Sequence, residues 1–468
     1  MGQLFGTDGI RGVANTELTP ELALGLGRAV VRTLREEGVA RPLLAVGRDP
    51  RASGEMLESA LVAGVCSAGG DAVVVGVLPT PGVAYLTPLL GADSGAMLSA
   101  SHNPVADNGI KFFGPQGYKL TDAEEERVEE LLQRTYEDRP TGPAIGRWRA
   151  EPAFVQRYID HLVAVGGPGR PLTGLRVVVD CANGAASAVA PVVLERLGAS
   201  VTALNAQPDG NDINDGCGST HPEVAAAAVV AEGADLGLAH DGDADRLIAV
   251  DANGRIVDGD AILAILAARL HAERGLPTVV TTQMTNLGFK RAMEGLGIGV
   301  IQTKVGDRYV LEAMRAGGHP LGGEQSGHVI FAEHATTGDG VLTAVRLLVA
   351  MASTGHPLAE LAGVMRRLPQ VLVNVSGVDR DRMAGAESLR KAIATETDRL
   401  GDGGRVLVRP SGTEPLVRVM VEAETEDDAA DTAARLAAVV ADELALTHHA
   451  PSPDPPGGDR RSTADRRR

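Results

Sequence analysis

The sequence predicts an α/β protein built from three similar α/β domains and a smaller α+β domain on their C-terminal side. Three stretches share one order of elements: a short β-branched run, a polar loop, a helical pattern, a glycine and a second β-branched run. These stretches are 41–77, 175–205 and 278–303. Because strands that alternate with helices form sheets with helices on their faces, each stretch predicts one such unit.

The fourth part of the chain has a different pattern. A β-branched run begins near Leu368, a charged helical stretch follows, and two further β-branched runs flank the loop of 405–422 before a last helical pattern. This order predicts the smaller α+β unit. After Thr447 the sequence contains Pro, Gly and charged residues without a large apolar residue, so we expect a disordered tail.

Composition limits the class of protein. The chain has 468 residues, of which 44% are hydrophobic, so it is too long for one ordinary core. A net charge of −17 disfavours nucleic acid or an anionic membrane as a partner. The three cysteines form no CxxC motif, and the chain has neither a secretory leader pattern nor an apolar run long enough to span a bilayer. We therefore expect a cytoplasmic protein.

The segment AHDGDADRLIAV places Asp241, Asp243 and Asp245 at alternate positions. A calcium EF-hand loop begins in the same way, but it requires Gly where Arg246 stands and Glu where Ala252 stands. Three carboxylates in one short loop repel one another unless a cation neutralises them, and hard oxygen ligands suit Mg²⁺. The alternative is an exposed acidic turn before a strand.

The segment VRPSGTEPLVRV offers two guanidinium groups, two hydroxyl groups and a flexible glycine. Its candidate residues are Arg409, Ser411, Gly412, Thr413 and Arg418. A glycine lets neighbouring N–H groups converge on an anion, and arginine binds phosphate oxygens in a bidentate manner. The alternative is an ordinary hairpin turn.

The segment GGEQSGH contains Glu324, Ser326 and His328 at alternate positions. In an extended segment the three side chains would face one way, and their groups suit a polyhydroxylated ligand. The alternative is a surface loop.

Near the N-terminus, FGTDGIRG holds Arg11 in a glycine-rich segment. An arginine presented by such a loop could stabilise a phosphate during its transfer, and the alternative is a simple turn.

The segment SASHNPVADNGIKFF contains the candidate nucleophile Ser101. The residues His102, Asn103 and Pro104 favour a turn that exposes the hydroxyl group. Lys111 is close enough in sequence to act as a general acid or base. The chain has no GxSxG elbow and no GxxxxGK[ST] loop, which disfavours an α/β-hydrolase and a P-loop kinase.

Four of these motifs occur in a fixed order: SASHNP, DGDADR, GEQSGH and RPSGTEP. In these motifs and their order the chain resembles the α-D-phosphohexomutase superfamily, and the resemblance covers 3–446. Within it, the segments GEQSGH, FGTDGIRG and KVGDRYV are most similar to the phosphoglucosamine mutases. The resemblance implies a heart-shaped fold of four domains around one cleft, each domain supplying one loop. The expected boundaries are 1–157 (serine loop), 158–256 (metal loop), 257–368 (sugar loop), 369–446 (phosphate loop) and 447–468 (tail).

The resemblance also implies a role for each candidate residue. Ser101 would carry a phosphoryl group, and its phosphate would bind Mg²⁺ together with Asp241, Asp243 and Asp245. Arg11 and Lys111 would support the transfer, with Lys111 or His328 handling protons. The residues expected to bind the phosphosugar substrate are Glu324, Ser326, His328, Arg409, Ser411, Gly412, Thr413 and Arg418.

The implied reaction converts glucosamine 6-phosphate to glucosamine 1-phosphate through a phosphoserine and a 1,6-bisphosphate, ahead of UDP-N-acetylglucosamine and cell-wall synthesis. Three alternatives stay open: a phosphomannomutase/phosphoglucomutase of the same superfamily, a phosphosugar phosphatase and a non-catalytic phosphosugar sensor. The family also implies a homodimer formed through the first domain. Cys217, in NDINDGCGSTH, is expected to be a partly buried structural cysteine.

Overall fold

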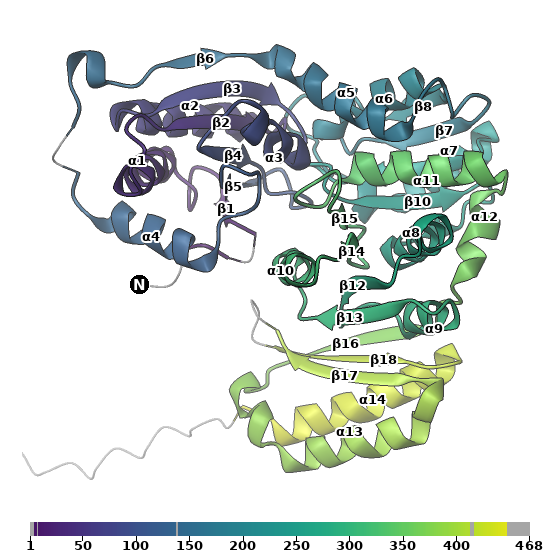
Figure 1. The fold of residues 1–468 in the computed structure, drawn as a ribbon. Coiled ribbons are helices and arrows are strands. Elements are labelled where there is room, and N and C mark those ends of the chain that lie inside the picture. Colours follow the sequence, from purple (N-terminus) through teal and green to yellow (C-terminus); the bar gives the residue numbers. More distant parts are fainter. Residues whose placement is uncertain (1–3, 7, 137–138, 412–415, 447–468) are drawn as a thin grey trace, which may run out of the picture. The chain divides into compact units, whose positions relative to one another are not determined.

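The computed structural model describes residues 4–6, 8–136, 139–411 and 416–446. The chain separates into two compact units, Met1–Arg367 and Leu368–Arg468. The first unit contains three β-sheets and the second contains one (Figure 1). The predicted disordered tail lies outside the described residues.

The first sheet is mixed and has the strand order β1-β5-β4-β2-β3-β6. Strand β2 runs parallel to β3 and β4, whereas β5 runs antiparallel to β1 and β4. The strands are β1 (Ile10–Val13), β2 (Leu43–Arg48), β3 (Asp71–Val77), β4 (Ser94–Leu98), β5 (Asp107–Phe113) and β6 (Trp148–Ala150). The helices are α1 (Pro20–Glu36), α2 (Ala52–Ser67), α3 (Thr80–Leu89) and α4 (Asp122–Gln133).

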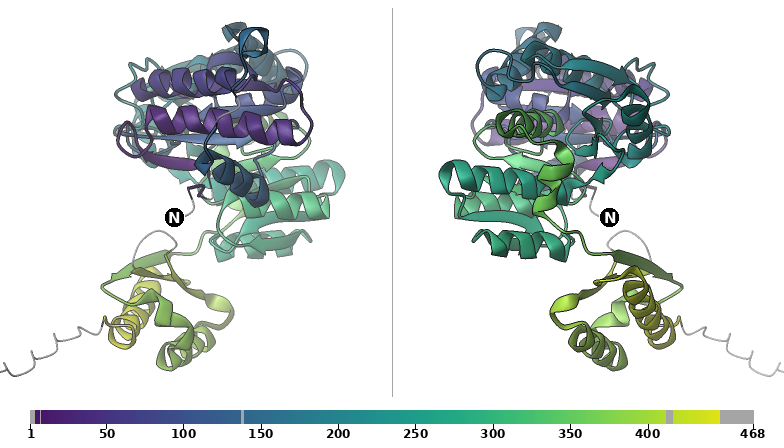
Figure 2. Two further views of the ribbon diagram at one scale, coloured as in Figure 1. Left: turned by 90° about the vertical axis from the view of Figure 1, so that its left-hand side faces the viewer. Right: turned by 90° about the vertical axis from the view of Figure 1, so that its right-hand side faces the viewer.

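Helices cover both faces of this sheet. Helices α1 and α2 lie side by side over one face, where their apolar residues join those of α4 and the strands in one core (Figure 2). Helix α3 contributes to a different core on the other face. The strand side chains divide between these two cores because successive strand residues point to opposite faces of a sheet.

The second and third sheets follow the same plan. Their strand orders are β11-β10-β9-β7-β8 and β13-β12-β14-β15. The second sheet and its helices are β7 (Arg176–Asp180), β8 (Ser200–Leu204), β9 (Leu236–His240), β10 (Leu247–Asp251), β11 (Ile256–Val257), α5 (Val155–Gly166), α6 (Ala190–Leu197) and α7 (Pro222–Glu232). The third sheet and its helices are β12 (Thr278–Thr282), β13 (Gly299–Thr303), β14 (Leu321–Gly323), β15 (Val329–Phe331), α8 (Gly259–Arg274), α9 (Leu287–Gly295), α10 (Asp307–Gly317), α11 (Gly340–Thr354) and α12 (Leu358–Leu361).

One apolar core runs through the three sheets of the first unit. It joins residues of α3, α5, α6, α8 and α11 with strands of all three sheets. Helix α11 has buried residues around most of its circumference, which explains why its sequence is almost continuously apolar. Among the described residues, no single helix is both long and apolar enough to cross a membrane, although the bent pair Gly340–Thr354 and Leu358–Val364 passes that test together.

The second unit is a three-stranded antiparallel sheet with two helices. The strand order is β16-β18-β17. Valines on one face of the sheet pack against α13 and α14. The elements are β16 (Gln370–Ser376), β17 (Arg405–Pro410), β18 (Leu416–Glu422), α13 (Glu387–Leu400) and α14 (Glu426–Glu443). The predicted fold class, three α/β units followed by a smaller α+β unit, is confirmed.

Four of the five predicted functional segments occupy the same kind of position; the fifth, which contains Arg11, runs into β1. The loops lie between two consecutive antiparallel strands: β4 and β5, β9 and β10, β14 and β15, and β17 and β18. In the three sheets of the first unit, the first strand of each pair also has a parallel neighbour. A loop tethered at both ends by buried strands holds its polar side chains more firmly than a free surface loop.

Candidate active site

Ser101 lies in the loop between β4 and β5 and is fully buried. Its Oγ donates a hydrogen bond to Asp241 Oδ2 at 2.5 Å. The prediction that the turn exposes the hydroxyl group is therefore wrong, because the turn packs its serine against the loop between β9 and β10. The φ angle of Ser101 is 51°, in the left-handed region that residues other than glycine seldom adopt. Such a conformation persists only where surrounding contacts hold it.

A buried arginine provides those contacts. Arg51 follows β2, is fully buried and pairs with Asp49 at 3.0 Å. Its guanidinium group donates to four backbone carbonyl groups of the serine loop, those of Ser101, Asn103, Pro104 and Asp107. Arg51 is absent from the predicted site residues. It stands three positions after the end of β2, and no local signal marks it, because the carbonyl groups that it binds lie 50 or more positions away.

Three carboxylates meet in the loop between β9 and β10. One ligand oxygen each from Asp241, Asp243 and Asp245 lies within 4.8 Å of the others, and all three residues are buried. We call these residues the acid cluster. Their burial rules out an exposed acidic turn. Within the described part of the chain, Oδ1 of Asp243 and Oδ1 of Asp245 are buried without a hydrogen-bond partner. Buried polar atoms are seldom left unsatisfied, so two such oxygens fit a divalent cation.

The acid cluster concentrates negative charge. Burial raises the pKa of Asp241, and the neighbouring carboxylates of Asp245 and Asp243 raise it further. Burial and Asp243 likewise raise the pKa of Asp245. Burial acts in the same direction on Asp243, but Lys111 and a hydrogen bond from Thr80 outweigh it and lower the pKa of that carboxyl group. A bound cation would stabilise all three carboxylates in their charged form.

Lys111 projects from β5 into this cluster and is buried. Its Nζ lies 3.0 Å from Asp8 Oδ2, 3.1 Å from Asp243 Oδ2 and 3.9 Å from Asp245 Oδ2. Burial alone would lower the pKa of Lys111, but these carboxylates raise it well above its ordinary value. An ammonium group in this state keeps its proton, so it supplies positive charge and hydrogen bonds and does not accept a proton at neutral pH.

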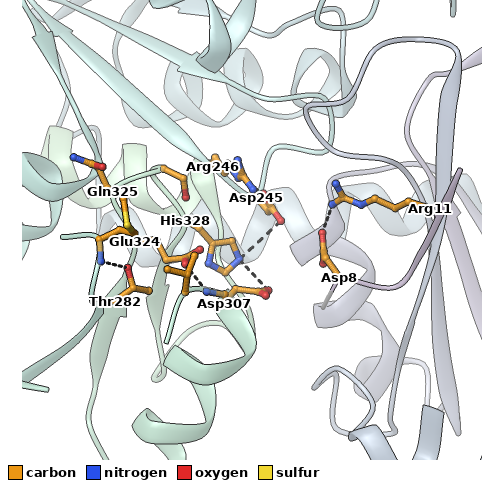
Figure 3. Close-up of a pocket in the computed structure, with 13 residues that line it drawn as sticks. Asp8, Arg11, Asp245, Arg246, Thr282, Asp307, Glu324, Gln325 and His328 are labelled. Atoms are coloured by element: carbon orange, nitrogen blue, oxygen red, sulfur yellow. Dashed lines mark hydrogen bonds and ion pairs between the residues drawn. The ribbon is translucent and has the colours of Figure 1, made fainter. Parts of the chain in front are cut away.

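A cavity of about 380 Å³ adjoins the acid cluster (Figure 3). Its walls include five predicted site residues: Arg11, Asp245, Glu324, Ser326 and His328. Four others are buried beside it and do not line it: Ser101, Lys111, Asp241 and Asp243. Asp245 is a member of the acid cluster and also lines the cavity, so it connects the two.

The segment 322–328 differs from its prediction. It is a turn between β14 and β15, closed by hydrogen bonds from Glu324 N–H to His328 O and from Gly327 N–H to Glu324 O. Gly327 has a φ of 91°, and a Cβ atom there would lie 2.1 Å from the carbonyl oxygen of Leu247. The predicted extended backbone is therefore wrong. The turn nevertheless places Glu324, Ser326 and His328 on the cavity wall.

His328 lies between two carboxylates in Figure 3. Its Nε2 is 3.8 Å from Asp245 Oδ2 and 3.7 Å from Asp307 Oδ2. The N–H of Gly338 donates to the same Nε2 at 3.2 Å, so in the neutral ring Nδ1 carries the proton. Nδ1 of His328 and Oγ of Ser326 are buried without a partner among the residues described. Two such atoms in residues of the cavity wall fit a polyhydroxylated ligand.

Charged residues that the prediction missed connect the first and third sheets. Lys119 donates to Asp8 Oδ1 at 2.6 Å and also to Asp307. Arg11 pairs with Asp8 and donates to Asn103 Oδ1 at 3.3 Å. Lys119 is 111 positions from Asp8 and 188 from Asp307, so no local spacing links them. The segments FGTDGIRG and KVGDRYV contain the two aspartates and could have marked them.

In the second unit, Arg409 of β17 stands directly opposite Arg418 of β18. Alternation along the strands places both on the face that does not pack against α13 and α14. Burial, together with the charge of Arg418, lowers the pKa of Arg409. Like charges directly opposite one another destabilise a sheet, so this pair fits an anion that would bind both.

Four other predicted residues remain: Ser411, Gly412, Thr413 and Cys217. Ser411 is buried at the end of β17. Gly412 and Thr413 lie outside the described residues. Cys217 is buried, and burial together with nearby carboxylates raises the pKa of its thiol to about 12, which fits a structural cysteine.

The comparisons with known proteins agree with this geometry. Models of the phosphoglucomutase/phosphomannomutase family match four consecutive segments: alpha/beta/alpha domains I, II and III at 2–139, 156–254 and 258–368, and the C-terminal domain at 372–439. A phosphoglucosamine mutase of Frankia alni is 60% identical over 450 residues, which cover 94% of this chain and 98% of that protein. The chain belongs to the phosphoglucosamine mutase family.

Solved structures extend the comparison. A phosphoglucomutase/phosphomannomutase family protein of Burkholderia thailandensis has a TM-score of 0.79 and 26% identity, covering 94% of this chain and 97% of that one. An N-acetylphosphoglucosamine mutase of Aspergillus fumigatus, in complex with GlcNAc-6P and magnesium, has a TM-score of 0.68 and 20% identity. The match covers 94% of this chain and 96% of that one. The Aspergillus likeness shows a shared fold. The superfamily follows from the family models and the curated relatives: the chain belongs to the α-D-phosphohexomutase superfamily.

Proposed function

We propose that the chain interconverts glucosamine 6-phosphate and glucosamine 1-phosphate, with Ser101 as the residue that carries the phosphoryl group. The observation that best supports this proposal is the hydrogen bond from Ser101 Oγ to Asp241, which holds one hydroxyl group at the acid cluster. Lys111 supplies positive charge beside it, as does Arg11 on the cavity wall. The name shared by the closely similar relatives supports the substrate.

The transfer requires Ser101 to be phosphorylated before the sugar reacts. The bond between phosphorus and Ser101 Oγ breaks as phosphorus bonds to the O1 hydroxyl of glucosamine 6-phosphate, which gives a 1,6-bisphosphate. After the intermediate reorients, its 6-phosphoryl group returns to Ser101 and glucosamine 1-phosphate leaves. Lys111 keeps its charge and offsets that of the phosphoryl group, so we assign the proton exchange to His328. It would take up the proton that O1 releases and return a proton to O6 when the 6-phosphoryl group leaves.

The donor set of the acid cluster suits Mg²⁺. Asp241, Asp243, Asp245 and the Ser101 phosphate would hold the ion through oxygen atoms only, which matches the preference of a hard cation. When bound, Mg²⁺ supplies positive charge that offsets the charge on the transferring phosphoryl group. The magnesium described for the Aspergillus relative supports this choice of ion.

The remaining predicted residues would bind the substrate. Glu324, Ser326 and His328 would contact the sugar hydroxyl groups from the cavity wall. The residues that we assign to the non-reacting phosphate are Arg409, Ser411, Gly412, Thr413 and Arg418. The arginine pair supports this assignment, because two opposed guanidinium groups are stabilised by an anion between them.

The proposal is tested by substrate preference. We expect kcat/KM for glucosamine 6-phosphate to exceed that for mannose 6-phosphate and glucose 6-phosphate, and Ser101→Ala to abolish the isomerisation. Faster turnover of the neutral sugars would assign the chain to phosphomannomutase/phosphoglucomutase activity. Release of inorganic phosphate at the rate of isomerisation would indicate a phosphatase, and full binding without turnover would indicate a sensor.

A further inference from the structure

We propose that Thr80 is a positioning residue of the metal site: its hydroxyl group fixes Oδ2 of Asp243 and so leaves Oδ1 of Asp243 available to the cation. The inference rests on the proposed metal site. It assigns a role to the N-terminal end of α3, which belongs to the first sheet, whereas the acid cluster belongs to the second.

Two hydrogen bonds join Thr80 to Asp243. Thr80 Oγ1 donates to Asp243 Oδ2 at 2.5 Å, and the N–H of Thr80 donates to the carbonyl oxygen of Asp243 at 3.0 Å. Thr80 is the first residue of α3, and both residues are fully buried. One residue thus fixes the backbone and the side chain of a proposed metal ligand that is 163 positions away.

The two carboxylate oxygens of Asp243 have unequal surroundings. Oδ2 accepts from Thr80 and from Lys111, whose Nζ lies 3.1 Å away. Oδ1 is buried and has no hydrogen-bond partner in the described part of the chain. Donors that satisfy one oxygen of a carboxylate and leave the other open set the orientation of a metal ligand.

Lys111 cannot set this orientation alone. Its ammonium group is shared among three carboxylates, at 3.0 Å from Asp8 and 3.9 Å from Asp245 in addition to its contact with Asp243. The hydroxyl group of Thr80 has Asp243 as its hydrogen-bond partner, and it is held at the start of a buried helix. Loss of this hydroxyl group would therefore let the carboxylate of Asp243 rotate while its charge stays paired with Lys111.

The test measures metal affinity in three full-length variants. Thr80→Val removes the hydroxyl group and keeps the branched shape, whereas Thr80→Ser keeps the hydroxyl group. The matched control is Thr87→Val, because Thr87 is also buried in α3 but donates to the carbonyl oxygen of Val83 in its own helix at 2.8 Å. Mn²⁺ is titrated into metal-free protein, and binding is followed by electron paramagnetic resonance of the free ion.

We expect the Kd for Mn²⁺ to rise about tenfold in Thr80→Val and to change by less than about twofold in Thr80→Ser and Thr87→Val. At saturating metal, the KM of Thr80→Val for glucosamine 6-phosphate should equal that of the wild type, which a general disturbance of the fold would not preserve. If the valine variant does not fold, Thr80→Ala removes the same hydroxyl group and places a smaller side chain at this position.

Three results would overturn the inference: wild-type affinity in Thr80→Val, equal losses in the valine and serine variants, or an equal loss in Thr87→Val. A wild-type protein that binds no Mn²⁺ would refute the metal site itself, and with it the role of Thr80. Wild-type binding together with an unaffected Thr80→Val would refute only the role of Thr80. The two failures are thus distinguishable.

Discussion

The acid cluster of the first unit and the arginine pair of the second unit concentrate charge of opposite sign in different ways. The acid cluster lies in a loop, is buried, and has oxygens without hydrogen-bond partners among the residues that the structure describes. Arg409 and Arg418 lie on paired strands, face one another across the sheet and are half-buried. Both arrangements bring like charges close together, as in a site that binds an ion or a group of the opposite charge.

The difference lies in what holds each group in place. The acid cluster depends on donors from distant parts of the chain, Lys111 and Thr80, which fix the side chain of Asp243. The arginine pair depends on the register of one local hairpin, in which positions 409 and 418 are partners. Changes at the acid cluster should therefore affect metal binding and chemistry together, whereas changes at the arginine pair should affect substrate binding alone.

Asp243→Asn is expected to have the largest effect, because it removes the charge on which Lys111 and Thr80 converge. We expect kcat to fall by about 100- to 1000-fold and Mn²⁺ binding to weaken strongly. Steady-state kinetics and metal titration measure both. Asp215→Asn, which alters an exposed carboxylate of the neighbouring loop, is the control and should change neither. Unchanged turnover in Asp243→Asn would contradict the claim that changes at the acid cluster affect metal binding and chemistry together.

Arg409→Gln should have an intermediate effect on a different parameter. Loss of a charge-assisted hydrogen bond to phosphate, about 2 kcal/mol, predicts that KM for glucosamine 6-phosphate rises about 30-fold. The affinity for Mn²⁺ should stay unchanged, since this residue belongs to the other charged group. Lys391→Gln, at an exposed position on α13, controls for the general loss of positive charge. A weakened metal site in Arg409→Gln would show that the two groups are not independent.

Asp339→Asn should have the smallest effect on activity. It tests whether burial near the acid cluster also raises the pKa of a carboxyl group outside the cluster. Asp339 accepts hydrogen bonds from Tyr158 and Leu342, and Gly340 beside it donates to the carbonyl oxygen of Ala244. Burial raises the pKa of Asp339 to about 6, although those hydrogen bonds oppose the change.

A carboxyl group with a raised pKa binds its proton more tightly in the folded state. Its contribution to stability is therefore fullest below the unfolded pKa near 4 and is lost as the pH rises through about 6. Asp339→Asn cannot titrate, so its free energy of unfolding should fall less than that of the wild type over this interval, by at most about 3 kcal/mol. Denaturant unfolding in EDTA measures the difference, and parallel pH profiles would contradict it.

Much of the fold follows from local sequence patterns. The stretch 41–77 contains β2, α2 and β3, and 278–303 contains β12, α9 and β13, as their β-branched runs and glycines predict. These signals act over a few residues, so they can be recognised without knowledge of the tertiary structure. The four loops predicted to be functional could be recognised for the same reason, because each is a short polar segment between two apolar runs.

The parts that sequence reasoning missed depend on contacts between distant segments. The turn at His102–Pro104 predicted an exposed Ser101, but the loop between β9 and β10, 140 positions away, packs against that residue. Thr80 and Arg51 have ordinary surroundings in the sequence, and their contacts with Asp243 and the serine loop exist only in the folded chain. The predicted extended segment at 322–328 instead turns at Gly327, whose close approach to Leu247 is also a tertiary contact.

The central claim is that the oxygen of Ser101 exchanges a phosphoryl group with the sugar. Protein carrying radioactive phosphate on Ser101, confirmed by mass of the peptide that contains it, is mixed with unlabelled glucosamine 6-phosphate for a single turnover. The account predicts that the label leaves the protein and appears on the sugar phosphates. Glucosamine 1-phosphate formed while all the label stays on Ser101 would contradict it.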